Sequence, residues 1–100
     1  MKEIIDKIGM PATLEQLAEE TAELGQASLK LARKIRDENP TPKLFGECLS
    51  NFIEEIGDVL LVVNMLVESG FISYEAIDSS IMAKEERWKK RLGIEVDSVE

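Results

Sequence analysis

Residues 45–67 read FGECLSNFIEEIGDVLLVVNMLV, and this stretch decides the fold. Apolar residues recur in it at steps of three and four, which is the repeat of one helix face. They are Phe45, Leu49, Phe52, Ile56, Val59, Val63 and Leu66. The second half is apolar on almost every side, because it also contains Leu60, Leu61, Val62 and Val67. The pattern predicts the buried central helix of an all-α protein.

A second long helix is predicted before the central one. Residues 13–16 read TLEQ, which has the form of a capping box and predicts a helix that opens at Thr13. Apolar and small residues again recur along one face: Leu14, Leu17, Thr21, Leu24, Ser28, Leu31 and Ile35. Pro40 disfavours helix at the residue before it and predicts the turn between the two long helices. Thr41 and Pro42 then suit the N-cap and the first residue of the central helix.

Two shorter helices are predicted at the ends of the chain. Residues 1–9 are expected to form a short leading helix that ends at Gly9. Ser73 is expected to cap a last helix that runs to about Leu92, with the inward residues Ile77, Ile81, Trp88 and Leu92. The tail, 93–100, is expected to be loose. We therefore expect one domain over 1–100, an antiparallel helical bundle of two long helices, a C-terminal helix and a short N-terminal helix.

Composition and charge restrict the partners of the protein. The chain has 100 residues and a net charge of -8, which disfavours binding to nucleic acid and to anionic membranes. It has no histidine, and its single cysteine, Cys48, cannot form an internal disulfide and fits a reducing compartment. No signal-peptide segment or membrane span is apparent, so we expect a cytoplasmic location. The small size and the apolar excess of the central helix predict self-association.

Two acidic pairs have the same spacing. Glu20 and Glu23 are three residues apart on one predicted long helix, and Glu55 and Asp58 are three apart on the other. Residues at this spacing lie on nearly the same helix face. Both cross-pairs have their midpoint at residue 39, in the predicted turn. An antiparallel hairpin should therefore place Glu23 opposite Glu55 and Glu20 opposite Asp58.

Four converging carboxylates call for a cation. Two unit charges about 4 Å apart repel by roughly 4 kcal/mol at an effective dielectric constant of 20. Asp58 lies in the apolar run 56–63, and no Lys or Arg occurs between Lys43 and Lys84 to pair with it. Oxygen-only ligands favour Mg²⁺ or Mn²⁺ over zinc, and Mg²⁺ keeps positions open for water and phosphates. The alternative is a solvated or helix-capped set of acids without a metal.

The acidic elements resemble those of a known family. Residues 19–23, EETAE, and 55–58, EIGD, are similar to the Glu-Glu-x-x-Glu and Glu-x-x-Asp signature of MazG-like, all-α nucleoside triphosphate pyrophosphohydrolases. The resemblance implies a helical bundle that forms homodimers or homotetramers. It also implies Mg²⁺-dependent cleavage of an NTP or dNTP to the monophosphate and pyrophosphate. The implied metal ligands and catalytic residues are Glu20, Glu23, Glu55 and Asp58.

Four further residues are candidates for binding the substrate. Lys30 lies seven residues beyond Glu23 on roughly the same face, and Asn51 precedes Glu55 by one turn. Lys84 and Arg87 lie on the last helix, where members of the family often carry basic residues. Cations near the C-terminus of a helix are also favoured by the helix dipole alone, so a purely structural role stays open.

In the expected reaction, a water activated by the metal attacks the α-phosphorus and pyrophosphate leaves. Other substrates stay open: phosphoribosyl-ATP pyrophosphohydrolases share the helical superfamily, and dUTP or dCTP is the alternative if the chain resembles a dimeric relative. From another class, the chain could be a non-catalytic helical module whose acidic face binds a basic partner. Such a module should show no Mg²⁺-dependent gain in thermal stability.

Overall fold

The structure is a computed structural model that describes residues 2–37 and 43–95, and every regular element in those ranges is a helix. The helices are α1 (Lys2–Ile8), α2 (Met10–Arg36), α3 (Phe45–Glu68) and α4 (Tyr74–Arg91). The predicted all-α class, with two long helices and a shorter one at each end, is confirmed. In the described ranges, no helix combines the length and the hydropathy that crossing a membrane requires.

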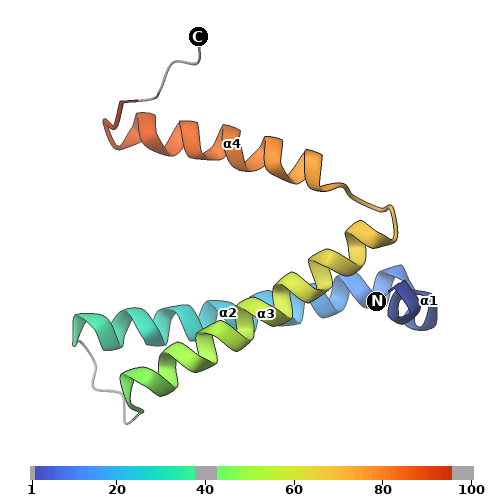
Figure 1. The fold of residues 1–100 in the computed structure, drawn as a ribbon. Helices are drawn as coiled ribbons and strands as arrows, with labels where there is room; N and C mark the ends of the chain where they lie inside the picture. The colour runs from blue at the N-terminus through green and yellow to red at the C-terminus, as the bar shows by residue number, and fades with distance from the viewer. Residues whose placement is uncertain (1, 38–42, 96–100) are drawn as a thin grey trace.

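The two long helices form an antiparallel hairpin, and α1 packs against both of them at the end far from their connection (Figure 1). The core at that end consists of Ile5 from α1 and Val62, Met65 and Leu66 from α3. Met10, Leu17 and Ile72 are partly buried against this cluster. The core therefore fixes α1 to the hairpin, close to the level of the acidic pairs.

The start of α2 differs from the prediction. The helix begins at Met10 with Pro11 in its first turn, one turn earlier than Thr13 suggested. Gly9 supplies the junction with α1 through a positive φ of 89°, which glycine adopts without a steric penalty. Thr13 is not a cap: it is fully buried inside the helix, and its hydroxyl donates to the Gly9 carbonyl oxygen at 2.8 Å.

The start of α3 also differs. Thr41 and Pro42 lie outside the described residues, but Lys43 and Leu44 are not helical, so the helix cannot begin at Pro42. It begins at Phe45, and the Leu44 N–H donates to the Glu47 carboxylate at 3.4 Å. Neither difference in the helix start alters which residues of α2 and α3 lie opposite each other.

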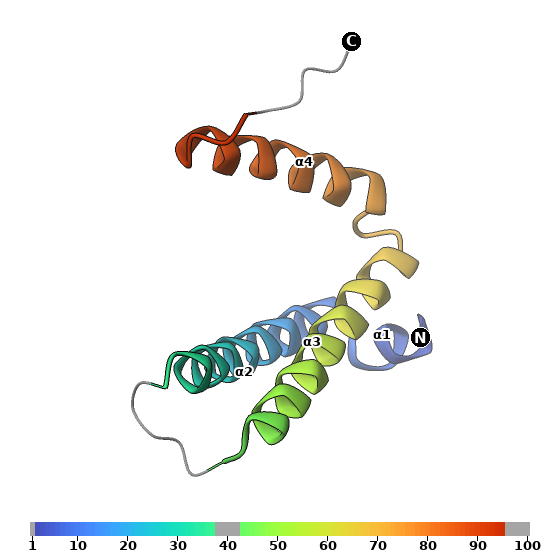
Figure 2. The same ribbon diagram turned by 60° about the vertical axis from the view of Figure 1, so that its left-hand side comes forward.

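Helix α4 leaves the rest of the molecule (Figure 2). Its predicted cap is present, because the Ser73 Oγ accepts from the Ala76 N–H at 3.2 Å. The predicted inward face is wrong for the single chain: α4 has no buried residue, and Ile81, Trp88 and Leu92 are 56%, 54% and 71% exposed. Near the start of the helix, the Tyr74 hydroxyl donates to the Asn64 side-chain oxygen of α3.

The single chain is consequently open. Its radius of gyration is 17.3 Å, against about 13 Å for a compact domain of this length. The second half of α3, which was predicted to be apolar almost all round in a buried central helix, is buried only in part in the single chain, since Leu60 and Leu61 are 53% and 43% exposed. Much of the apolar surface of α3 and α4 has no partner among the described residues of one chain.

Candidate metal centre and the adjoining pocket

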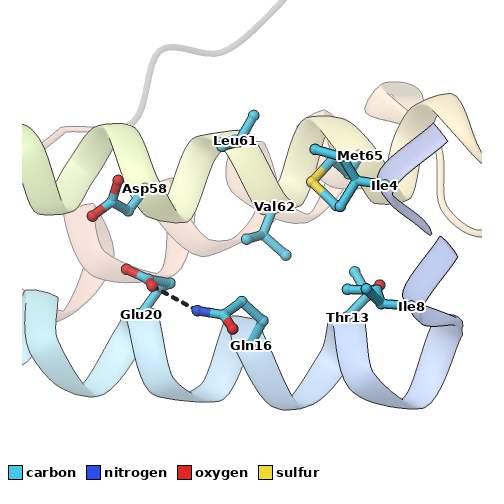
Figure 3. A pocket seen from close by; sticks show the side chains of 9 residues that line it. All are labelled: Ile4, Ile8, Thr13, Gln16, Glu20, Asp58, Leu61, Val62 and Met65. Atoms are coloured by element: carbon cyan, nitrogen blue, oxygen red, sulfur yellow. Dashed lines mark hydrogen bonds between the residues drawn. The ribbon is translucent and has the colours of Figure 1, made fainter. Parts of the chain in front are cut away.

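The hairpin brings the predicted carboxylates together. Oxygen atoms of Glu20 and Glu23 from α2 and of Glu55 from α3 all lie within 4.8 Å of one another. Asp58, about one turn beyond Glu55, lies across from Glu20 (Figure 3). The two pairs thus meet at one level because each has a spacing of three and the helices run antiparallel.

The local environment of these carboxylates suits a cation. Glu20 receives one hydrogen bond, from the Gln16 side-chain amide to its Oε1 at 2.8 Å (Figure 3). The Oε2 atoms of Glu20 and Glu55 are buried and have no hydrogen-bond partner in the described part of the chain. Buried, unpaired carboxylate oxygens are costly. Since all the candidate metal-ligand atoms are carboxylate oxygens, the set fits a hard divalent cation such as Mg²⁺ or Mn²⁺.

Electrostatic repulsion within the cluster is concentrated on Glu55. Removal from water raises the pKa of Glu55 above its usual value of 4.5, and the negative charges of Glu23, Asp58 and Glu20 raise it further. A hydrogen bond with Glu23 acts in the same direction on this pKa. The metal-free site therefore binds a proton at Glu55 more readily than a free carboxylate would, and a bound cation would relieve the same repulsion.

A pocket of about 310 Å³ adjoins the cluster (Figure 3). Its polar end is formed by Glu20 and Asp58, which also belong to the acidic cluster. The remaining lining residues come from three helices and are mostly apolar: Ile4, Ile8, Thr13, Gln16, Leu61, Val62 and Met65. The sequence did not predict this pocket, and Gln16 was expected to act in the cap of α2, although its position four residues before Glu20 is a signal for a side-chain contact.

The other predicted substrate-binding residues are dispersed. Lys30 is exposed on α2, and Asn51 is half-buried on α3, one turn before Glu55. Lys84 and Arg87 line a separate cavity of about 370 Å³ on α4 together with Lys90 and Arg91. Because α4 leads away from the hairpin, the fold of one chain does not bring Lys84 and Arg87 to the acidic cluster (Figures 1 and 2).

Comparison with known protein families identifies the family of the chain. Residues 9–92 match the family described as the MazG nucleotide pyrophosphohydrolase domain. The chain belongs to this family. The match includes all four carboxylates and α2–α4, whereas α1 precedes it. Comparisons with curated proteins and with solved structures gave no match. Membership of the MazG family supports a hydrolase that acts on nucleotides.

Proposed function

We propose that this MazG-family protein is a Mg²⁺-dependent nucleoside triphosphate pyrophosphohydrolase, with Mn²⁺ as a possible substitute. It would convert an NTP or dNTP to the nucleoside monophosphate and pyrophosphate. The observation that carries the proposal is the convergence of Glu20, Glu23 and Glu55, with two buried oxygens that lack hydrogen-bond partners in the described ranges, inside the family match. Cys48 is buried and free, as expected for the cytoplasmic location that we also propose.

In this proposal Glu20, Glu23, Glu55 and Asp58 hold the cation. When bound, it supplies charge neutralisation for the phosphates and activation of water. Gln16 orients Glu20 through its hydrogen bond, and the packed hairpin fixes the separation of the two acidic pairs. In the reaction, a bond forms between the water oxygen and the α-phosphorus. The bond between the α-phosphorus and the oxygen that links it to the β-phosphorus breaks, and pyrophosphate leaves.

Two alternatives predict different results. A phosphoribosyl-ATP pyrophosphohydrolase would release pyrophosphate from that substrate and poorly from common nucleotides. A non-catalytic acidic module would release none. The family match favours an enzyme over the module, because the matched domain is named for nucleotide pyrophosphohydrolysis.

The direct test supplies the full-length protein with a panel of NTPs, dNTPs and phosphoribosyl-ATP. We expect Mg²⁺-dependent release of pyrophosphate and monophosphate in equal amounts, and none in EDTA. We also expect Mg²⁺ to stabilise the fold, by about 2.7 kcal/mol at a concentration of 100 times its Kd. Release of orthophosphate in place of pyrophosphate would contradict the proposed bond cleavage. Neither turnover nor a thermal shift with Mg²⁺ would favour the interaction module.

We further propose that the protein is a homodimer or homotetramer. The open chain supports this proposal, as do the exposed apolar side chains of Ile81 and Trp88 on α4 and of Leu92 just after it, because such a surface is costly in water. A second copy would also give Lys84 and Arg87 a route to the phosphates that their own chain does not provide.

Sedimentation equilibrium at micromolar concentration is expected to give a multiple of the 11.2 kDa chain mass. Trp88→Glu should weaken association at least about tenfold, since large aromatic side chains dominate interface energies. Leu29→Glu, which changes a similarly exposed apolar residue on α2, is the matched control. A wild-type mass of 11.2 kDa would contradict the oligomer.

A further inference from the structure

The pocket beside the acidic cluster has a wall that lies outside the family match. Helix α1 covers residues 2–8, whereas the match begins at residue 9. Ile5 anchors α1 in the core with Val62 and Met65. Ile4 and Ile8, four residues apart on α1, line the pocket and are 44% and 45% exposed. The structure thus holds two large apolar side chains at an open cavity, although burying them would be favourable.

The inside of the pocket is mostly apolar, and the two polar side chains away from its acidic end, Thr13 and Gln16, each donate a hydrogen bond. Leu61, Val62 and Met65 form the α3 side. On the α2 side, the Thr13 hydroxyl donates to the Gly9 carbonyl and the Gln16 amide donates to Glu20. Such a lining suits an apolar ring held by shape and contact more than by hydrogen bonds.

The polar end of the pocket indicates which chemical group is attached to the ring. Glu20 and Asp58 belong both to the pocket and to the acidic cluster (Figure 3). A molecule whose phosphates lie at the cluster can therefore extend its organic end towards α1 without crossing protein. The volume of about 310 Å³ is at the lower limit of small-molecule sites, roughly 300 Å³, so it fits a small ring system.

We propose that the pocket between α1 and the hairpin holds the nucleobase of the substrate, and that Ile4 and Ile8 limit the size of the base. This inference rests on the proposed function, since it assigns the base end of the same substrate. Recognition by shape predicts similar affinities for bases of similar size and rejection of bases with bulky substituents.

The binding test uses the full chain, Mg²⁺ and non-hydrolysable α,β-methylene analogues of ATP and UTP. Inorganic tripolyphosphate is the matched probe without a base. Ile8→Trp fills the pocket and should raise the Kd of at least one nucleotide analogue by about tenfold, the value of one buried apolar contact. It should leave tripolyphosphate affinity within about twofold of wild type. Ile35→Trp, at an exposed position in the last turn of α2 that does not line the pocket, is the control.

A second readout needs no substitution in the pocket. In wild-type protein with labelled Met and Ile methyl groups, the signals of Met65 and Ile8 should move with each nucleotide analogue and not with tripolyphosphate. Ile35 should stay unchanged. If the analogues bind while Met65 and Ile8 do not respond, the base lies elsewhere and this inference fails while the proposed function stands. Signals that respond to protein dilution but not to the analogues would mean that a second copy fills the pocket, which also overturns it. Absence of any analogue binding would overturn the proposed function, and this inference with it.

Discussion

Glu55→Gln is expected to lower the rate of pyrophosphate release by at least about 100-fold, the scale of losing one charge-stabilising group in an active site. Glu55 is the α3 member of the cluster whose oxygens lie within 4.8 Å of one another. The amide keeps the size of the side chain but removes the negative charge that would hold the cation. The measurement is kcat/KM for the best substrate of the panel at saturating Mg²⁺.

Glu54→Gln is the matched control for this experiment. Glu54 is the preceding residue on the same helix, is exposed, and points about 100° away from Glu55 around the helix axis. Its substitution should leave kcat/KM within about twofold of wild type, as expected for a surface change away from the site. Equal activities of Glu55→Gln and the wild type would show that the cluster is not the metal site.

The same Glu55→Gln substitution, although it lowers the rate, should raise the stability of the metal-free protein. The pKa of Glu55 is raised in the folded state, so its contribution to stability is fully present below the unfolded pKa and is lost as pH rises through the folded pKa. In EDTA at neutral pH, the variant should therefore melt at a higher temperature than the wild type. The difference should shrink on acidification and vanish below about pH 4.5. Mg²⁺ should reverse the order of the two melting temperatures.

The acidic cluster was predictable because it depends on two local patterns. The spacing of three within each pair fixes a helix face, and the turn near Pro40 fixes which residues face each other across a hairpin. An error of three residues in the start of α2 does not disturb that register. Gly9 and Pro11 compete with Thr13 as signals for the helix start. They prevail because Gly9 accepts a positive φ, and because Pro11 lacks only an N–H that would have no acceptor in the first turn of a helix.

The placement of α4 and of the pocket was not predictable in the same way. Periodicity identifies Ile81 and Trp88 as members of an apolar face, but it does not say which surface covers that face. The pocket depends on the docking of α1 through Ile5, a contact between segments more than 50 residues apart in sequence. Only the assembled structure brings Ile4 and Ile8 to the polar end formed by Glu20 and Asp58.

Leu66→Ala is expected to lower the free energy of unfolding by about 2–5 kcal/mol. Leu66 is 3% exposed and packs in the core with Ile5, Val62 and Met65. Small domains have total stabilities of about 5–15 kcal/mol, so this one cavity would remove a large share. Urea unfolding in the presence of Mg²⁺, followed by circular dichroism at a fixed protein concentration, measures the change.

Two further variants separate the cavity from a general loss of apolar surface. Leu29→Ala removes the same atoms from a position on α2 that is 62% exposed, and should change the free energy of unfolding by no more than about 0.5 kcal/mol. Leu66→Met nearly conserves the volume and should cost less than about 1.5 kcal/mol. Because this core also ties α1 to α3, Leu66→Ala should loosen α1 and weaken nucleotide binding at a urea concentration where the hairpin is still folded. Equal stabilities of Leu66→Ala and Leu29→Ala would mean that the α1–α3 core is not a main source of stability.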